Sequence, residues 1–576
     1  MREVPKKLTI SWLREQYLKG SLKPAEIVEE CVARMDRASD ANVWIYRLGR
    51  EELDGYLKRL GRMNPTEYPL WGIPFAIKDN IDLKGVPTTA GCPKYAYVPK
   101  ESAEVVRRVI RAGAIPLGKT NLDQFATGLV GTRSPYGEVH NSLRPELISG
   151  GSSAGSAVAV ALGQAAFSFG TDTAGSGRVP AALNNIIGYK PGVGAWPSRG
   201  VVPACASIDC VSAFVNSMED AAAVDAAVRG LCPGDRWSRE IPNPAPALPS
   251  RIRIPELSGK DFFGPFASEY RRAWEKTVDS LRALDIPVET TDDTLFRKAA
   301  EILYGGPWIA ERWSDLGKFV TEHADDVFPV TLQILRSGEG GKYTAAELFT
   351  AMHQLQEYRM KVRGLLDDTV YVTPTCAGTW TREQVRNDPA AANTAMGRFT
   401  NHCNLLDLCA VAIPGIPAAP DLPFGITVFG LSSREGLALG FSHRYEAKSE
   451  RTSELVVCGL HMRGLPLEQD LKNLGGEFLH DDRTAPCYRM FCLKTEPRKP
   501  GLLRVDEGGK SLAVEVWKLP VKSFGNFALS IPSPLCLGRV ILENGAEVEG
   551  FLCESFCRRQ NEDITDYGGF RMYLRS

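Results

Sequence analysis

Apolar positions recur with helical spacing near the start of the chain. Residues 8–36, LTISWLREQYLKGSLKPAEIVEECVARMD, place apolar side chains three and four positions apart, with an interruption at Gly20. Pro24 suits the first turn of a helix, where its missing N–H is not needed. The pattern predicts two helices, a hairpin that covers a sheet.

The pattern changes between about residues 70 and 240. Short apolar runs with β character alternate there with helical patterns such as SAEVVRRVIRAGA. Alternation of this kind predicts an α/β fold, a sheet with helices on both faces. The apolar-rich segment from Ser153 to Gln164 predicts a helix buried in the core, whose N-terminus emerges at Ser152 and Ser153.

The second half of the chain shows fewer strong signals. Residues 242–256 are rich in proline and predict a connector over the surface. Residues 371–419 return to apolar runs and predict closing strands of the same domain. Polarity rises from Ser432 to Glu454, and this predicts a linker. We therefore expect a large first domain over 1–440, a linker over 441–454 and a second domain over 455–576.

Length and composition exclude several classes of function. A chain of 576 residues is too long for one core, and 44% hydrophobic with 24% charged residues is ordinary for a globular protein. A net charge of −1 argues against a nucleic-acid or membrane partner and favours a small-molecule substrate. The 14 cysteines show no Cys-x-x-Cys spacing, and the start MREVPKKLTISWL shows no signal peptide, so we expect reduced thiols and a cytoplasmic protein.

Two clusters of glycine and serine flank the buried segment, GGSSAGS at 150–156 and GTDTAGSGRVP at 170–180. They contain Ser152 and Ser176, each in a run of small residues that lets backbone N–H groups approach a ligand closely. Successive N–H groups from Thr173 to Ser176 would suit a tetrahedral oxyanion, which favours acyl transfer. One of the two serines is the expected nucleophile.

A serine nucleophile needs a base, and the local candidate is a lysine. No histidine lies between residues 141 and 322, although distant histidines stay open. Lys78 follows an apolar run in GIPFAIKDN, residues 72–80. Burial disfavours the ammonium form, so a buried lysine can act as a base near neutral pH. Ser152 could bridge base and nucleophile, because a hydroxyl both donates and accepts a hydrogen bond.

The motifs GIPFAIKDN, GGSSAGS and GTDTAGSGRVPAA together resemble the amidase signature family. The resemblance implies that the domain at 1–440 is an amidase domain, a mixed central sheet flanked by helices, with neither cofactor nor metal. It also implies Ser176 as nucleophile, Ser152 as a relay preceded by a cis peptide bond, and Lys78 as base. Thr173, Ala174 and Gly175 would then lie on the substrate side of the nucleophile.

Within this family the chain is most similar to the allophanate hydrolases. The similarity includes LGKTNLDQFATGLVGTRSPYG at 117–137 and VVPACASIDCVS at 201–212. It implies hydrolysis of allophanate, substrate binding at Gly128, a homodimer and a functional link to a separate urea carboxylase. The supply of allophanate by breakdown of s-triazines or biuret stays open.

A tyrosine and an arginine eight positions apart hold the substrate carboxylate in allophanate hydrolases, and Tyr304 and Arg312 match both positions. An arginine fork grips a planar carboxylate with two parallel hydrogen bonds. Pro307 predicts the first position of the helix that carries Arg312. The alternative role for Arg312 is a surface ion pair.

The C-terminal part resembles the C-terminal domain of allophanate hydrolases, itself similar to the γ-glutamyl cyclotransferase fold, a small α/β domain. The similarity lies in VCGLHMRGLPL at 457–467 and in the later motifs RTAPCYRMF, SLAVEVWKL and GFLCE. It implies that this domain helps the amidase product lose its carboxyl group, with His461 involved. A lone histidine can equally be structural.

Three other functions stay open at this stage. A broad-specificity amidase, or a glutaminase-type subunit of a transamidation complex, would share the triad without needing Arg312. An esterase of the α/β-hydrolase type would use Ser153, because residues 151–155 satisfy G-x-S-x-G. The third is a binding protein that keeps the fold without activity.

Overall fold

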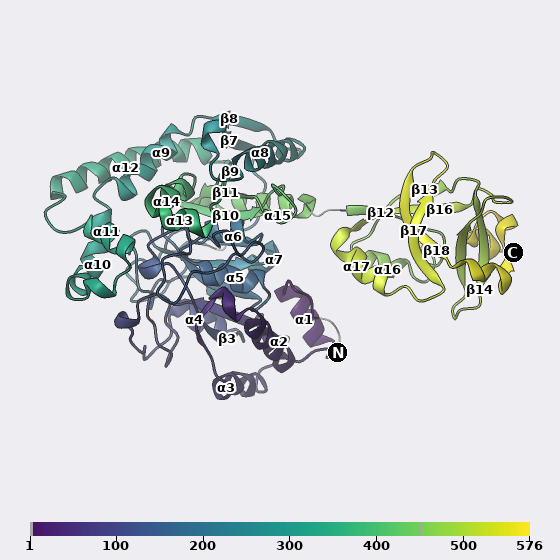
Figure 1. Cartoon of the computed structure of the whole chain (residues 1–576), viewed down its shortest axis with the longest axis horizontal. Helices are drawn as coiled ribbons and strands as arrows, with labels where there is room; N and C mark the ends of the chain where they lie inside the picture. The colour runs from purple at the N-terminus through teal and green to yellow at the C-terminus, as the bar shows by residue number, and fades with distance from the viewer. Residues whose placement is uncertain (1–3, 243, 450–451) are drawn as a thin grey trace. The chain divides into compact units, whose positions relative to one another are not determined.

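The computed structural model describes residues 4–242, 244–449 and 452–576. The chain divides into two compact units, the first ending at Glu446 and the second beginning at Ala447. Figure 1 shows the helices and strands of each unit. Each unit has a hydrophobic core of its own.

The first unit is organised around an 11-stranded mixed sheet in the order β1-β3-β2-β4-β6-β5-β10-β11-β9-β7-β8. Strand β2 lies between β3 and β4 and is parallel to both, whereas β6 is antiparallel to β4. The strands are β1 (Trp44–Arg47), β2 (Pro74–Lys78), β3 (Ile115–Thr120), β4 (Phe167–Asp172), β5 (Ile187–Lys190), β6 (Cys210–Val215), β7 (Arg251–Pro255), β8 (Val288–Thr291), β9 (Thr369–Pro374), β10 (Leu408–Pro414) and β11 (Gly425–Leu431).

Helices surround this sheet (Figure 1). They are α1 (Ile10–Leu18), α2 (Pro24–Arg37), α3 (Arg50–Leu60), α4 (Glu104–Arg111), α5 (Ala154–Ala161), α6 (Val179–Leu183), α7 (Met218–Val228), α8 (Ala267–Arg282), α9 (Thr294–Tyr304), α10 (Ile309–Glu322), α11 (Pro329–Arg336), α12 (Ala345–Leu366), α13 (Arg382–Asn387), α14 (Pro389–Gly397) and α15 (Glu435–Ser449). The α/β architecture predicted from the alternating pattern is confirmed.

Two local predictions are confirmed in detail. Helices α1 and α2 flank Gly20, and Pro24 is the first residue of α2. All eight residues of α5 are buried, and Ser153 caps its N-terminus. Helix α5 packs very closely because Gly155 lies against backbone: an added Cβ would stand 2.7 Å from the nitrogen of Asn121.

Three local predictions differ from the structure. Helix α10 begins at Ile309, so Pro307 precedes it instead of starting it. The proline-rich stretch 242–256 contains strand β7, which pairs with β8 and β9. Most of the expected linker 441–454 is helix α15, and β12 follows from Thr452; residues 450 and 451 lie outside the described part. Polar side chains on a helix at the end of a domain gave that stretch the composition of a linker.

The second unit contains two smaller sheets, with strand orders β13-β16-β12-β18-β17 and β15-β14-β19. Its core includes Val456, Tyr488, Val516, Trp517 and Phe570. The elements are β12 (Thr452–Val457), α16 (Glu468–Asn473), β13 (Glu477–Arg483), β14 (Tyr488–Leu493), β15 (Lys499–Arg504), β16 (Ala513–Pro520), α17 (Val521–Leu529), β17 (Leu535–Ile541), β18 (Glu547–Cys553), β19 (Glu562–Asp563) and α18 (Phe570–Tyr573).

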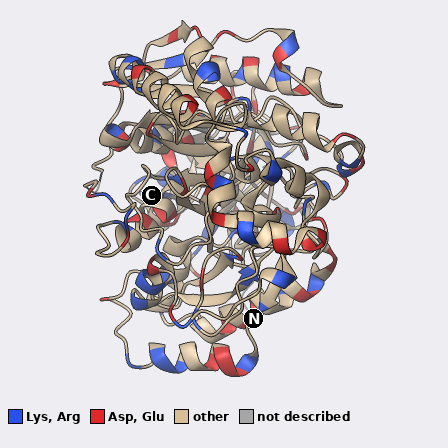
Figure 2. Cartoon of the chain, turned by 90° about the vertical axis from the view of Figure 1, so that its left-hand side faces the viewer, with Lys and Arg blue, Asp and Glu red and all other residues tan. Residues whose placement is uncertain are grey.

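Charged residues of both signs are interspersed along the helices that Figure 2 shows. This distribution agrees with the net charge of −1. None of the helices in the described residues has the length and apolar character needed to cross a bilayer.

Candidate active site

Lys78 is the last residue of β2, and every residue of this strand is buried. Its Nζ lies 2.8 Å from Ser152 Oγ and 2.7 Å from Thr171 Oγ1, within hydrogen-bond distance of both. The structure therefore brings together the base and the relay that the sequence predicted. Thr171, on the neighbouring strand β4, is an additional partner of the lysine.

Burial sets the protonation of this lysine. Desolvation lowers the pKa of Lys78 to about 7, although the negative charges of Asp123, Asp209 and Asp172 act in the opposite direction. A substantial fraction of the side chain is then the neutral amine at physiological pH, with a lone pair that can accept a proton.

Ser152 is fully buried, and the peptide bond between Gly151 and Ser152 is cis. Gly151 is required by close packing: a Cβ there would stand 2.7 Å from the nitrogen of Gly131 and would collide with the carboxylate of Asp123. The backbone of Asp123 in turn donates to the carbonyl of Ser152 at 3.0 Å. Ser152 is therefore held between α5 and the loop that begins at Asp123.

The turn that carries Ser176 is fixed by the carboxylate of Asp172 at the end of β4. Its two oxygens accept the N–H groups of Gly175 at 2.8 Å and Gly177 at 3.0 Å. Arg178 pairs with the same carboxylate through Nε at 2.8 Å and Nη2 at 2.9 Å, and both side chains are fully buried. Charged hydrogen bonds of this bidentate kind are strong and directional, so the turn is rigid.

Ser176 itself has a free hydroxyl. Within the described residues its Oγ makes no hydrogen bond, so Ser176 and Ser152 are not bonded to each other. The N–H groups of Thr173, Ala174 and Ser176 likewise find no acceptor in this part of the chain. Gly175 differs from the expectation, because its N–H is donated to Asp172. Three N–H groups beside the nucleophile thus remain for a ligand.

Ser153, the nucleophile of the esterase alternative, is used by the backbone. Its hydroxyl donates to the carbonyl of Thr171 at 3.1 Å and accepts from the N–H of Thr171 at 3.3 Å. The residue is fully buried. This arrangement ties α5 to β4 and disfavours the esterase interpretation.

Tyr304 at the end of α9 and Arg312 in α10, the two residues predicted to hold the substrate carboxylate, lie in contact with each other. Arg312 Nη2 donates to the Tyr304 hydroxyl at 3.3 Å, and Nη1 donates to Thr127 Oγ1 at 2.8 Å. The arginine is 1% exposed, and its Nε makes no hydrogen bond to any residue that the structure describes. A surface ion pair is therefore excluded as the role of Arg312, and one edge of the guanidinium is left for a ligand.

Gly128 lies next to Thr127 in the loop from Asp123 to Arg133. Its φ of +155° and the 2.5 Å that would separate an added Cβ from Asp123 Oδ2 explain why glycine stands here. Asp123 holds the loop by accepting the N–H groups of Val130, Gly131 and Arg133. The loop thus places Gly128 beside the residue that contacts Arg312.

Comparison with known families now bears on these residues. The amidase family profile matches residues 26–439, and the profile of the allophanate hydrolase C-terminal domain matches residues 453–575.

The chain belongs to the amidase family.

Individual relatives agree with this assignment. The urea amidolyase of Saccharomyces cerevisiae is 36% identical over 98% of this chain, which covers 33% of that protein. A glutamyl-tRNA(Gln) amidotransferase chain from Exiguobacterium sibiricum is 30% identical, with 74% of this chain and 94% of the relative covered. The chain thus spans about a third of the length of the urea amidolyases that it matches.

Among solved structures, an allophanate hydrolase from Kluyveromyces lactis superposes with a TM-score of 0.71. It is 36% identical, with 98% of this chain and 99% of that chain covered. The predicted combination of an amidase fold and a C-terminal domain is confirmed by these matches.

The structure adds Asp209 to the site of this amidase. Thr173 Oγ1 donates to Asp209, whose second oxygen accepts the N–H groups of Ala204 at 2.7 Å and Cys205 at 3.0 Å. Burial raises the pKa of Asp209 to about 6 despite these bonds. The signal was present in the sequence, because a lone aspartate inside the apolar run VVPACASIDCVS is a buried charge that needs partners.

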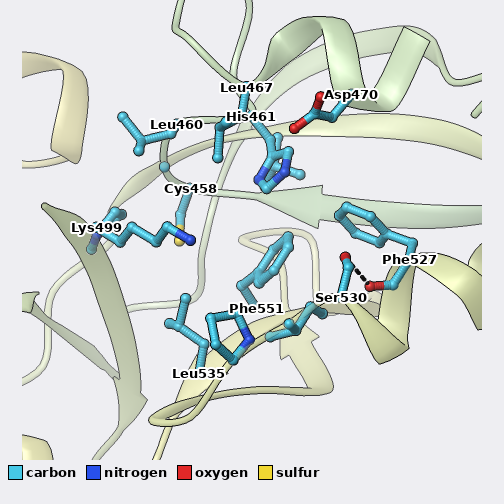
Figure 3. A pocket seen from close by; sticks show the side chains of 15 residues that line it. Cys458, Leu460, His461, Leu467, Asp470, Lys499, Phe527, Ser530, Leu535 and Phe551 are labelled. Atoms are coloured by element: carbon cyan, nitrogen blue, oxygen red, sulfur yellow. Dashed lines mark hydrogen bonds between the residues drawn. The ribbon is translucent and has the colours of Figure 1, made fainter. Parts of the chain in front are cut away.

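The allophanate hydrolase C-terminal domain has a pocket of its own, with a volume of about 260 Å³ (Figure 3). The ring of His461 stacks on Phe551 at 5.4 Å and meets the edge of Phe527 at 5.3 Å. Lys499 and Asp470 also line the pocket, and Figure 3 shows the Lys499 side chain reaching into it.

Burial lowers the pKa of His461 to about 4, and the charge of Lys499 acts in the same direction. The imidazole is therefore neutral at physiological pH, while Lys499 supplies a positive charge within the same pocket. Within the described residues, no cluster of three or more His, Cys, Asp or Glu side chains is arranged to hold a metal ion.

Proposed function

We propose that the chain hydrolyses allophanate, the carboxylated form of urea, at its terminal amide. The observation that carries this proposal is the buried Arg312, which has an unpartnered Nε and meets Tyr304 in an amidase of the serine and lysine type. A buried guanidinium is costly unless it binds an anion, and a neutral amide substrate would not use it. The allophanate hydrolase from Kluyveromyces lactis supports the choice of substrate.

The first half-reaction forms an acyl-enzyme. The neutral amine of Lys78 accepts the proton of Ser152, which accepts that of Ser176, and Ser176 Oγ attacks the amide carbon. The N–H groups of Thr173 and Ala174 are the proposed donors to the resulting oxyanion. The tetrahedral intermediate collapses, and ammonia leaves with a proton returned through Ser152.

The second half-reaction releases the product. Water gives up a proton to the same relay and attacks the ester carbon of acylated Ser176, so that the serine regains its hydroxyl. The product is N-carboxycarbamate. Throughout both steps the substrate carboxylate rests on the free edge of Arg312 and on the Tyr304 hydroxyl, which aligns the amide carbon with Ser176.

The C-terminal domain is proposed to act on N-carboxycarbamate, which loses carbon dioxide to give carbamate and finally a second ammonia. Lys499 would hold a carboxylate, and the neutral imidazole of His461 would hydrogen-bond the group that departs or the nitrogen left behind. Because carboxylation of urea yields allophanate, we also propose a functional link to a urea carboxylase.

One assay tests the proposal: ammonia release from allophanate, malonamide, biuret and glutamine by the full chain. We expect kcat/KM for allophanate to exceed the other values by at least tenfold. A broad-specificity amidase would accept malonamide equally well, and a glutaminase-type subunit would prefer glutamine. Either result would contradict the assignment.

A further inference from the structure

Among the described residues of the amidase domain, three arginines are less than 2% exposed: Arg133, Arg178 and Arg312. Arg178 forms a direct ion pair with Asp172. Within the described residues, no carboxylate lies within 4.0 Å of the guanidinium nitrogens of Arg133 or Arg312. The charges of Asp123 near Arg133 and of Asp209 near Arg312 act on these guanidiniums without a direct ion pair. A ligand carboxylate would supply the direct ion pair that each buried guanidinium lacks.

These two arginines hold the same residue from two sides. Arg133 Nη1 donates to the carbonyl of Thr127 at 3.0 Å, and Arg312 Nη1 donates to Thr127 Oγ1 at 2.8 Å. Thr127 follows Phe125 and Ala126, which both have a φ of +52°. Such backbone is unfavourable for side chains of this type, so the position of Thr127 depends on its hydrogen bonds.

Arg133 also contacts the backbone of Pro389 and the carboxylate of Asp123. Its Nη2 donates to the carbonyl of Pro389 at 2.9 Å, and its main-chain N–H donates to Asp123 Oδ1 at 2.9 Å. Its Nε, like that of Arg312, is buried and has no hydrogen-bond partner in the described part of the chain. Burial lowers the pKa of Arg133, Asp123 opposes this effect, and the positive charge of Arg312 adds to it. The two guanidiniums therefore repel each other across Thr127.

We propose that Arg133 is a positioning residue that makes this site select anionic substrates: it holds Thr127 against Arg312 and adds a second positive charge beside the carboxylate clamp. An arriving carboxylate would relieve the repulsion between the two arginines and bind more tightly than to Arg312 alone. This inference rests on the proposed function, because it assumes that Arg312 holds a substrate carboxylate.

The test compares an anionic and a neutral substrate. We expect Arg133→Met to raise KM for allophanate by about tenfold or more, the effect of one charged hydrogen bond, and KM for malonamide by less than about threefold. Arg133→Lys keeps the charge and should recover a large part of the loss. The matched control is Arg229→Met, another poorly exposed arginine, which pairs with Asp225 and Glu435. It should lower the melting temperature and leave the ratio of the two KM values unchanged.

Binding of malonate, measured by calorimetry, gives a readout without turnover. Malonate should bind the wild-type chain and bind the Arg133→Met and Thr127→Val variants at least about tenfold more weakly. Equal losses on allophanate and malonamide, or unchanged malonate binding, would overturn the role of Arg133. If Arg133→Met fails to fold, the KM values and the malonate binding of Arg133→Lys and Thr127→Val test the role of Arg133 instead. Absence of ammonia release from allophanate by the wild-type chain would instead contradict the proposed function.

Discussion

Lys78 Nζ lies 2.8 Å from Ser152 Oγ, whereas among the described residues Ser176 shows no hydrogen bond to either of them. The proposed base and relay are thus in contact, and the contact between the proposed relay and the proposed nucleophile is the one still to be made. Catalytic hydrogen bonds are often incomplete in the absence of substrate. A hydrogen bond from the Ser176 hydroxyl to Ser152 would complete the proposed relay.

The depressed pKa of Lys78 predicts the pH dependence of acylation. Because the amine is the active form and its pKa is about 7, kcat/KM for allophanate should rise about tenfold per pH unit below 7 and level off above about 8. A pH–rate profile from 5.5 to 9.5 checks this. The Lys78→Ala variant should be nearly inactive, and its kcat/KM should not show this rise with pH. A wild-type profile that is flat from pH 6 to 9 would exclude Lys78 as the base.

Substitution of each serine by alanine should distinguish the role of Ser176 from that of Ser153. Ser176→Ala should lower kcat by more than about a thousandfold, because no group remains to form the acyl-enzyme. Ser153→Ala loses two hydrogen bonds to the backbone of Thr171 and should mainly lower stability. Steady-state ammonia release and thermal unfolding of both variants give the comparison. An essential Ser153 with a dispensable Ser176 would favour an esterase mechanism.

Loss of the clamp should affect charged substrates selectively. Arg312→Ala removes the hydrogen bonds to a carboxylate and should lower kcat/KM for allophanate by about tenfold to a hundredfold more than for malonamide. Tyr304→Phe keeps the ring beside the guanidinium, at 5.5 Å, and removes only the hydroxyl, so its effect should be smaller. If Arg312→Ala reduced activity on both substrates equally, Arg312 would be structural.

The two domains should be separable in function. A chain that ends at Glu446 contains the proposed triad and clamp, and its core is independent of the second unit, so it should still release the first ammonia. N-carboxycarbamate should then accumulate, as it should with His461→Ala in the full chain. Carbon-13 NMR during turnover detects this species. Identical product profiles from the three proteins would leave the C-terminal pocket without a catalytic role.

Close packing of α5 predicts a stability difference between two helical glycines. In Gly155→Ala the new methyl group would press on the backbone of Asn121 and on the carbonyl of Val43, and the free energy of unfolding should fall by about 1–3 kcal/mol. The control is Gly364→Ala in α12, where the Cβ would meet nothing within 4 Å. That variant should gain about 0.5–1 kcal/mol. Denaturant unfolding monitored by circular dichroism measures both.

The sequence predicted structure best at positions where the residue types present have a single physical explanation. An apolar run that ends in Lys78 predicted a desolvated amine, and the segment after Ser153 predicted a buried helix. Long-range pairings could not be predicted in this way. The meeting of Arg133 and Arg312 at Thr127 joins segments 185 positions apart, and no local pattern encodes such a contact. The polarity of α15 likewise suggested a linker, because a polar helix and a polar loop have similar compositions.

The residues proposed for proton transfer and those proposed for substrate choice come from separate parts of the fold. Lys78, Ser152 and the turn of Ser176 are fixed by β2, β4 and α5, and Asp172 with Arg178 braces that turn independently of the clamp. Tyr304 and Arg312 reach the site from α9 and α10, about 130 positions later in the chain. Mutations in these two helices would change the groups proposed to meet the substrate carboxylate and leave the Asp172–Arg178 brace of the Ser176 turn in place. Over evolution, substitutions in α9 and α10 would change the substrate that the amidase domain accepts, while the residues proposed for hydrolysis stay the same.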